Sequence, residues 1–141
     1  MKDEQLLSSV FNETRKQSML LGELLTKTDN RSMRVAILSQ IESYDEINKS
    51  AGEEICALGL TPKSKGSLSD KLSVLGASIS VGTNPSLSNI ARTVTENSKK
   101  CTEKTQSVME DCRCATPSAY NIARKLIASE EENRNRINKF L

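Results

Sequence analysis

Residues 41–62 read IESYDEINKSAGEEICALGLTP, and this stretch decides the fold. Its apolar residues recur every three or four positions, which is the pattern of one long amphipathic helix. The pattern stops at Gly59, where a C-terminal cap belongs, and Pro62 forbids an early restart. Followed back along the chain, it predicts a helix over about residues 31–58. Asp29-Asn30 is a break that is expected to supply the N-cap of this helix. Its expected inner face is Ile37, Ile41, Tyr44, Ile47, Asn48, Ala51, Ile55 and Leu58.

The same spacing predicts three more long helices, over about residues 3–28, 85–112 and 117–140. Asn84–Pro85 and Thr116–Pro117 each look like an N-cap followed by proline at the first helical position. The expected inner faces are Leu7, Val10, Thr14, Gln17, Leu21, Leu24 and Thr28 in the first helix; Leu87, Ile90, Val94, Asn97, Cys101, Thr105 and Val108 in the third; and Ala119, Ile122, Leu126, Glu130, Asn133, Ile137 and Phe140 in the fourth.

A longer connection separates the second and third long helices. Residues 61–67 are expected to form a loop, and a short amphipathic helix is predicted over residues 68–81, with Gly82 as its end. The other connections are tight, so they predict two antiparallel hairpins. The long connection permits a crossover between them. The sequence therefore predicts one all-α domain over residues 1–141.

The chain resembles the small ferritin-like proteins of unknown function, a bacterial group allied to the rubrerythrins. The matching features are ICALGLTP at residues 55–62, GSL at 66–68 and the glycine break at Gly82. The resemblance implies a ferritin-like four-helix bundle with a short extra helix in the long crossover. It also implies an inner position that resembles a metal site, but no demonstrated activity.

Ferritin-like di-iron sites need one Glu from each of two helices and Glu-x-x-His from each of the other two. The helical phase places at those positions Gln17, Tyr44, Ile47, Asn97, Glu130 and Asn133. Only Glu130 has the required side chain, and the chain contains no histidine. Glu42 lies about 160° from the centre of the apolar arc, and Glu96 is similarly outward. We therefore expect no working di-iron site, no metal and no cofactor.

Polar residues near the midpoints of the four helices are expected to converge at one height. They are Gln17, Tyr44, Asn97, Glu130 and Asn133. In one interpretation they hydrogen-bond where carboxylates once held metal, and a protonated Glu130 donates to Asn97 or Gln17. In the other they line a small polar cavity that binds water or one cation.

Cys112-Arg113-Cys114 is the most noticeable local motif. Two thiols one residue apart are a candidate pair for soft-metal binding or disulfide exchange. A complete zinc site needs four ligands, and no histidine is present to help. The alternative is two small residues at a helix end. Cys101 is expected to be a buried small hydrophobic residue.

Composition argues against several classes of function. The net charge of +2 and the aromatic content of 3% do not favour nucleic-acid binding. Without histidine there is no Ser-His or Cys-His triad, and no glycine-rich phosphate loop is present. Residues 72–81 are too short to span a bilayer, and no signal peptide is expected. These features predict a cytoplasmic protein with reduced cysteines.

The expected function is a non-enzymatic structural or interaction role. Val35 and Leu38 lie off the inner arc of the helix over 31–58, and Leu20 lies at the margin of the inner arc of the helix over 3–28. Together they predict an exposed apolar patch near the first hairpin. The expected partner of this patch is a second copy or the helix at 68–81, with another protein as a further alternative. The rival function is a metal-binding or redox protein that uses Glu130 or the Cys112/Cys114 pair.

Overall fold

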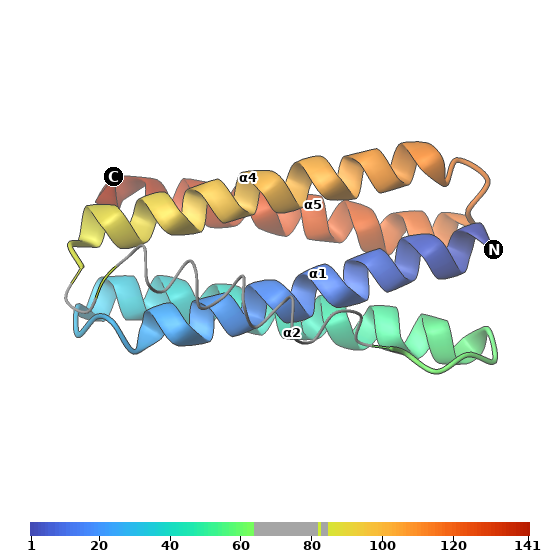
Figure 1. Cartoon of the computed structure of the whole chain (residues 1–141), viewed down its shortest axis with the longest axis horizontal. Coiled ribbons are helices and arrows are strands. Elements are labelled where there is room, and N and C mark those ends of the chain that lie inside the picture. Colours follow the sequence, from blue (N-terminus) through green and yellow to red (C-terminus); the bar gives the residue numbers. More distant parts are fainter. Residues whose placement is uncertain (64–81, 83–84) are drawn as a thin grey trace.

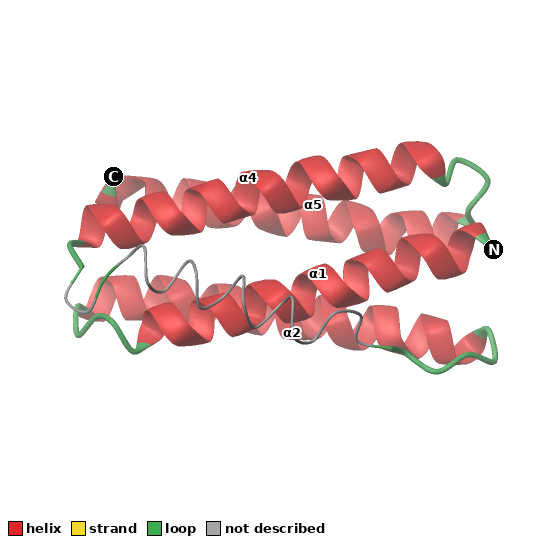
Figure 2. Ribbon diagram, in the orientation of Figure 1, coloured by secondary structure: helices red, strands yellow, loops and turns green. Residues whose placement is uncertain are grey.

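The computed structural model describes residues 1–63, 82 and 85–141, and every regular element in them is helical (Figure 2). The elements are α1 (Lys2–Leu25), α2 (Arg31–Ala57), α4 (Leu87–Asp111), α5 (Pro117–Ile137) and a 3₁₀ turn, η1 (Asn138–Phe140). The prediction of an all-α bundle is confirmed. The helix predicted over 68–81 lies outside the described residues.

The four long helices lie side by side, with α1 packed on α2 and α4 packed on α5 as predicted (Figure 1). α2 and α4 run in the same direction, so α2 ends at one end of the bundle and α4 begins at the other. α2 also contacts α5, and α1 also contacts α4, whereas α2 and α4 make almost no direct contact. Neighbouring helices are therefore antiparallel, which places opposite ends of their dipoles together. The parallel helices α1 and α5 touch across the bundle.

Both ends of α2 are formed as the sequence predicts. The Asn30 side chain accepts a hydrogen bond from the Met33 N–H at 2.9 Å, which caps the first turn. At the other end Gly59 has φ +80°, and the Leu60 N–H donates to the Ile55 carbonyl at 3.3 Å. This geometry is a Schellman motif, and its left-handed position favours glycine.

α1 ends three residues earlier than predicted. The guanidinium of Arg34, on α2, donates to the Leu25 carbonyl at 2.7 Å and to the Thr28 carbonyl at 3.0 Å. A cation that satisfies the last carbonyls removes the need for a further helical turn. The prediction missed this contact because it joins two helices.

In the second hairpin, the predicted start of α4 is wrong and the predicted start of α5 is correct. The predicted cap Asn84 lies outside the described residues, and Pro85 precedes α4 instead of beginning it. The hydroxyl of Ser86 caps α4 by accepting from the N–H three residues later, at 3.1 Å. Thr116 and Pro117 do begin α5, as predicted. The last three residues of the predicted fourth helix form the tighter turn η1.

A second contact at Thr116 connects the beginnings of α1 and α5. The Asp3 carboxylate accepts from the Thr116 N–H and from its hydroxyl, each at 2.8 Å. Negative charge near a helix N-terminus is favourable. The first turn of α1 therefore holds the start of α5 in place.

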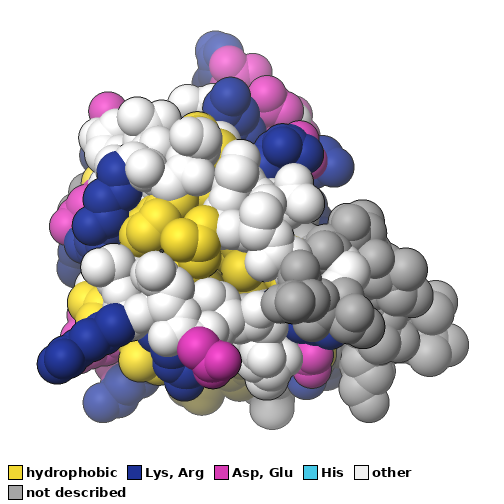
Figure 3. All heavy atoms as spheres, turned by 90° about the vertical axis from the view of Figure 1, so that its left-hand side faces the viewer, with side chains coloured by type: hydrophobic (Ala, Val, Ile, Leu, Met, Phe, Trp, Pro, Cys, Tyr) yellow, Lys and Arg dark blue, Asp and Glu magenta, His cyan; other side chains and the backbone are white. Residues whose placement is uncertain are grey.

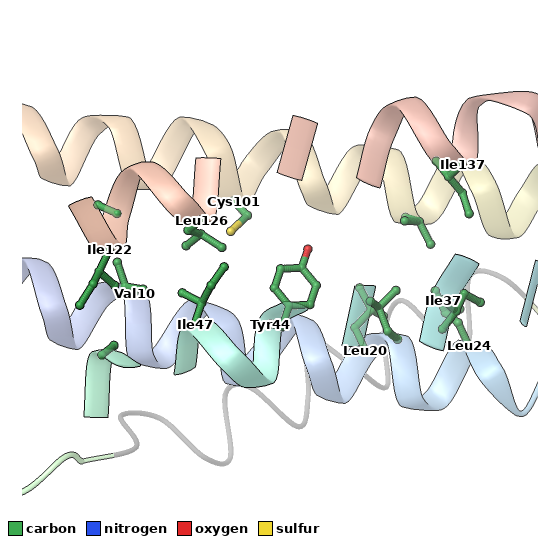
Figure 4. Close-up of a cluster of buried hydrophobic side chains, with 14 of the residues drawn as sticks. Val10, Leu20, Leu24, Ile37, Tyr44, Ile47, Cys101, Ile122, Leu126 and Ile137 are labelled. Carbon is green, nitrogen blue, oxygen red and sulfur yellow. The ribbon is translucent and has the colours of Figure 1, made fainter. Parts of the chain in front are cut away.

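The core fills the space between the helices. Seen from the end where the C-terminus lies, hydrophobic side chains gather in the middle and charged ones on the outside (Figure 3). Along the bundle, Val10 and Ile122 lie to one side of Tyr44, and Leu24 and Ile37 lie to the other (Figure 4). No helix in the described part of the chain combines the length and the apolar character that crossing a bilayer requires.

Gly59→Ala is expected to lower the free energy of unfolding by about 1 kcal/mol, because a β-carbon is disfavoured at φ +80°. Gly22→Ala is the matched control. Gly22 lies inside α1 with open space around its β-position, so alanine there should stabilise by roughly 0.5–1 kcal/mol. Urea unfolding of both variants measures the difference. Equal effects would show that the turn at Gly59 is not as described.

Candidate functional site

The centre of the bundle contains a buried hydrogen bond between two helices. The Tyr44 hydroxyl, from α2, donates to Oε1 of Glu130, from α5. Both side chains are buried, and Glu130 has 0% exposure. The Tyr44 hydroxyl points away from α2, toward the side of α4 and α5, near Cys101 (Figure 4). Two residues predicted to converge are thus brought together.

The second oxygen of Glu130 has no such partner. Oε2 is buried and accepts no hydrogen bond from the described residues. Burial raises the pKa of Glu130 above its usual 4.5, although the Ser98 and Tyr44 hydroxyls and the Arg134 cation oppose that rise. Glu13 is close enough to raise this pKa further. The site therefore favours the neutral acid more than an exposed glutamate would.

The neighbours of Glu130 also keep their protons. Burial raises the pKa of Tyr44 well above its usual 10, and the charge of Glu130 adds to the effect. Burial likewise raises the pKa of the Cys101 thiol, with Glu130 and Glu13 adding to it. A phenol and a thiol in these states donate hydrogen bonds, but neither is a good nucleophile.

A second buried carboxylate lies on α1. The Glu13 side chain is 4% exposed, and its Oε1 accepts from the Lys104 ammonium of α4 at 2.5 Å. The Lys104 side chain is 59% exposed, so the cation reaches the carboxylate from the surface. The charge of Glu13 is therefore compensated within the protein.

Further polar contacts surround this centre. Gln40, on α2, donates to the Ser129 hydroxyl of α5 at 3.1 Å. The Ser98 hydroxyl of α4 donates to the Glu130 carbonyl at 3.3 Å and accepts from Arg134 at 3.0 Å. These bonds hold α5 against both α2 and α4 at the level of Glu130.

The other predicted centre residues do not join this hydrogen bond. Gln17 and Asn133 are buried, but neither hydrogen-bonds to Tyr44 or Glu130. Ile47 is buried as an apolar residue of the core. The inward placement of Asn97 is wrong: it is half-buried, and its amide donates to the Thr93 carbonyl of its own helix at 2.9 Å. The expected donation from Glu130 to Asn97 or Gln17 does not occur.

Glu13, Gln40 and Ser98 are the buried polar residues that sequence reasoning missed. Each follows a stripe with a repeat near 3.5 residues, as helices in bundles do when they pack at a small angle. In α4 both Asn97 and Ser98 fit the spacing between Val94 and Cys101. A repeat of seven counted from Ile90 selects Asn97, whereas one counted back from Thr105 selects Ser98, so the spacing alone does not decide between them. In α1 the same repeat connects Leu6, Glu13 and Leu20.

The four cysteines are free thiols that differ in burial. Cys112 is buried and Cys114 is exposed, and burial raises the pKa of Cys112. Cys101 is buried, as predicted, and Cys56 is exposed at the end of α2. In the described part of the chain, no three or more Cys, Asp or Glu side chains come together so that they could hold a metal ion.

An open groove of about 710 Å³ lies along the first half of α1. Residues of the α2 end and of α4 complete its walls, among them Leu60, Lys104 and Val108. Tyr44 and Glu130 do not line it. The buried pair is therefore not at the floor of this groove.

Glu130→Gln is expected to raise the free energy of unfolding at pH 7 by roughly 1 kcal/mol and to change it little near pH 4. The pKa of Glu130 is raised by burial, so the folded chain binds more protons than the unfolded chain between pH 4.5 and the folded-state pKa. The contribution of protonated Glu130 to the free energy of unfolding is fully present below pH 4.5. It is lost as the pH rises through the folded-state pKa. Urea unfolding of wild type and variant between pH 4 and 8 measures this.

Tyr44→Phe provides the opposite change. It keeps the ring but removes the hydroxyl, so it should destabilise the fold at pH 7 by about 1–3 kcal/mol. If Glu130→Gln were less stable than wild type at pH 7 with the same pH dependence, Glu130 would not behave as a buried acid.

Lys104→Met should lower the free energy of unfolding by roughly 1–2 kcal/mol, because Glu13 would lose its counter-charge while the apolar stem is retained. Lys100→Met is the matched control, since Lys100 is exposed one turn earlier on α4. Thermal unfolding at one pH compares them. Equal losses for the two variants would show that the ion pair contributes nothing.

The chain was compared with known protein families, with curated proteins and with solved structures, and none of them matches it.

Proposed function

We propose that this chain is a non-enzymatic helical-bundle protein with a structural or interaction role. In this proposal it uses a ferritin-like scaffold whose centre holds the Tyr44–Glu130 hydrogen bond in place of a di-iron site. The observation that carries the proposal is this bond between Tyr44 and Glu130. In the proposed ferritin-like scaffold, the phenol of Tyr44 takes a position where a di-iron site needs a carboxylate.

The charge balance at the centre supports the same proposal. Two iron ions need several carboxylates and imidazoles that face one point. Lys104 compensates Glu13, and burial favours the neutral form of Glu130. The centre therefore has little negative charge left to attract cations.

The helix directions support the ferritin-like part of the proposal. α2 and α4 are parallel and begin at the same end, so residues 58–86 connect opposite ends of the bundle. Bundles with one long crossover connection have this arrangement. We propose a cytoplasmic location as well, because exposed free thiols such as Cys56 and Cys114 suit a reducing compartment.

A second candidate function is a site for one cation or an ordered water at Glu130. The observation that favours it is the buried Oε2, which accepts no hydrogen bond from the described residues. Water or a cation commonly satisfies such an atom. Glu13 would add a second oxygen from the opposite side of the bundle.

Metal analysis of the purified full chain separates the two candidates. The protein is produced in medium with added iron, manganese and zinc and is then desalted. Its metal content is measured by inductively coupled plasma mass spectrometry. The leading proposal expects far less than one metal ion per chain. Stoichiometric metal that disappears in Glu130→Gln would overturn it and establish the second candidate. Metal that persists in Glu130→Gln but disappears in Cys114→Ser would instead assign a thiol site.

A further inference from the structure

The outer face of α2 carries two exposed apolar residues. Val35 is 59% exposed and Leu38 is 49% exposed. The prediction that Leu20 belongs to this patch is wrong, because Leu20 is buried in the core. The other large exposed apolar side chains among the described residues, Met1 and Leu141, lie at the ends of the chain. Val35 and Leu38 differ from these terminal residues, since they lie together in the interior of the helix α2. Their exposure is therefore unusual.

Two charged residues continue the same stripe. Arg31 lies four positions before Val35, and Glu42 lies four positions after Leu38, so all four share one face of α2. Both are exposed, and neither forms an ion pair within the described part of the chain. The face thus has an apolar centre with a cation at one end and an anion at the other.

This arrangement is self-complementary. Arg31 and Glu42 are equally far in sequence from the midpoint between Val35 and Leu38, about 8 Å along the axis in each direction. When a second α2 lies antiparallel across a two-fold axis at that midpoint, Val35 meets Leu38 of the other copy. Arg31 then meets Glu42 of the other copy, and the symmetry repeats both contacts.

Other positions of the axis are less favourable. Glu42, Asp45 and Glu46 are all exposed in the middle of α2. A two-fold axis placed there would bring carboxylates against carboxylates, which repel each other. The charge pattern therefore selects the first three turns of α2.

We propose that a second copy of this chain docks on the Arg31–Glu42 face of α2, antiparallel and about a two-fold axis. This docking rests on the proposed interaction role, and it names a second copy of the chain as the partner. Few side chains take part, so the contact is smaller than the standard interface of about 1,600 Å². The dimer should accordingly have a dissociation constant weaker than about 1 µM.

Charge reversal with mixing tests the proposal directly. In Arg31→Glu alone and in Glu42→Arg alone, both end contacts join like charges, so sedimentation should show association weakened roughly tenfold or more. In an equimolar mixture, a dimer of one chain of each variant regains two opposite-charge contacts. Association in the mixture should return to the wild-type level.

The controls separate this face from others. Lys49→Glu lies on the same side of α2 beyond the contact and should associate like wild type. Leu38→Glu should abolish association, while circular dichroism confirms that the helices remain. A wild-type chain that stays monomeric at concentrations near 1 mM would overturn the proposal. So would single variants that associate normally, or a mixture that recovers nothing.

Failure here is distinguishable from failure of the proposed function. If the chain is monomeric and binds no metal, only the proposed docking of a second copy is contradicted. If the chain binds stoichiometric metal at Glu130, the proposed function is contradicted, whether the chain is a monomer or a dimer.

Discussion

The burial of the Glu130 carboxyl between four apolar stripes is the constraint on which the centre of this bundle depends. A carboxyl away from water costs several kcal/mol unless it is neutral or hydrogen-bonded. Tyr44 supplies one hydrogen bond from the facing helix, and burial itself favours the proton. Both responses require α2 and α5 to keep one relative height, because a shift of one turn would separate the two side chains by about 5 Å.

The polar contacts along the other interfaces act in the same direction. The Asn48 amide, on α2, donates to the Phe11 carbonyl of α1 at 2.8 Å, and the Tyr120 hydroxyl, on α5, donates to the Met109 carbonyl of α4 at 2.5 Å. Apolar stripes of Leu, Ile and Ala tolerate sliding, since one layer resembles the next. Directional bonds do not, so they select one register among similar ones.

Most of the fold could be predicted from the sequence because its signals are local. Gly59, Thr116 and Pro117 mark helix ends through their own backbone and side-chain chemistry. The errors arose where distant residues decide the outcome. Arg34 ends α1 from the neighbouring helix, and the choice between Asn97 and Ser98 depends on the angle at which α4 meets its neighbours. Similarly, Tyr44 and Glu130 could be predicted to face inward. Glu13 fits the seven-residue repeat of α1, but the Lys104 cation that compensates its charge lies on another helix and leaves no local signal.

The contact between Asp3 and Thr116 has a consequence for synthesis of the chain. The two residues are 113 positions apart, and Tyr44 and Glu130 are 86 apart. α1 and α2 leave the ribosome as a complete hairpin long before α5 exists, so their inner faces have only each other to contact. Closure of such distant pairs is entropically costly and comes late in folding. Nascent chains that end before residue 116 therefore expose the apolar inner faces of α1 and α2, and exposed apolar surface is what chaperones bind.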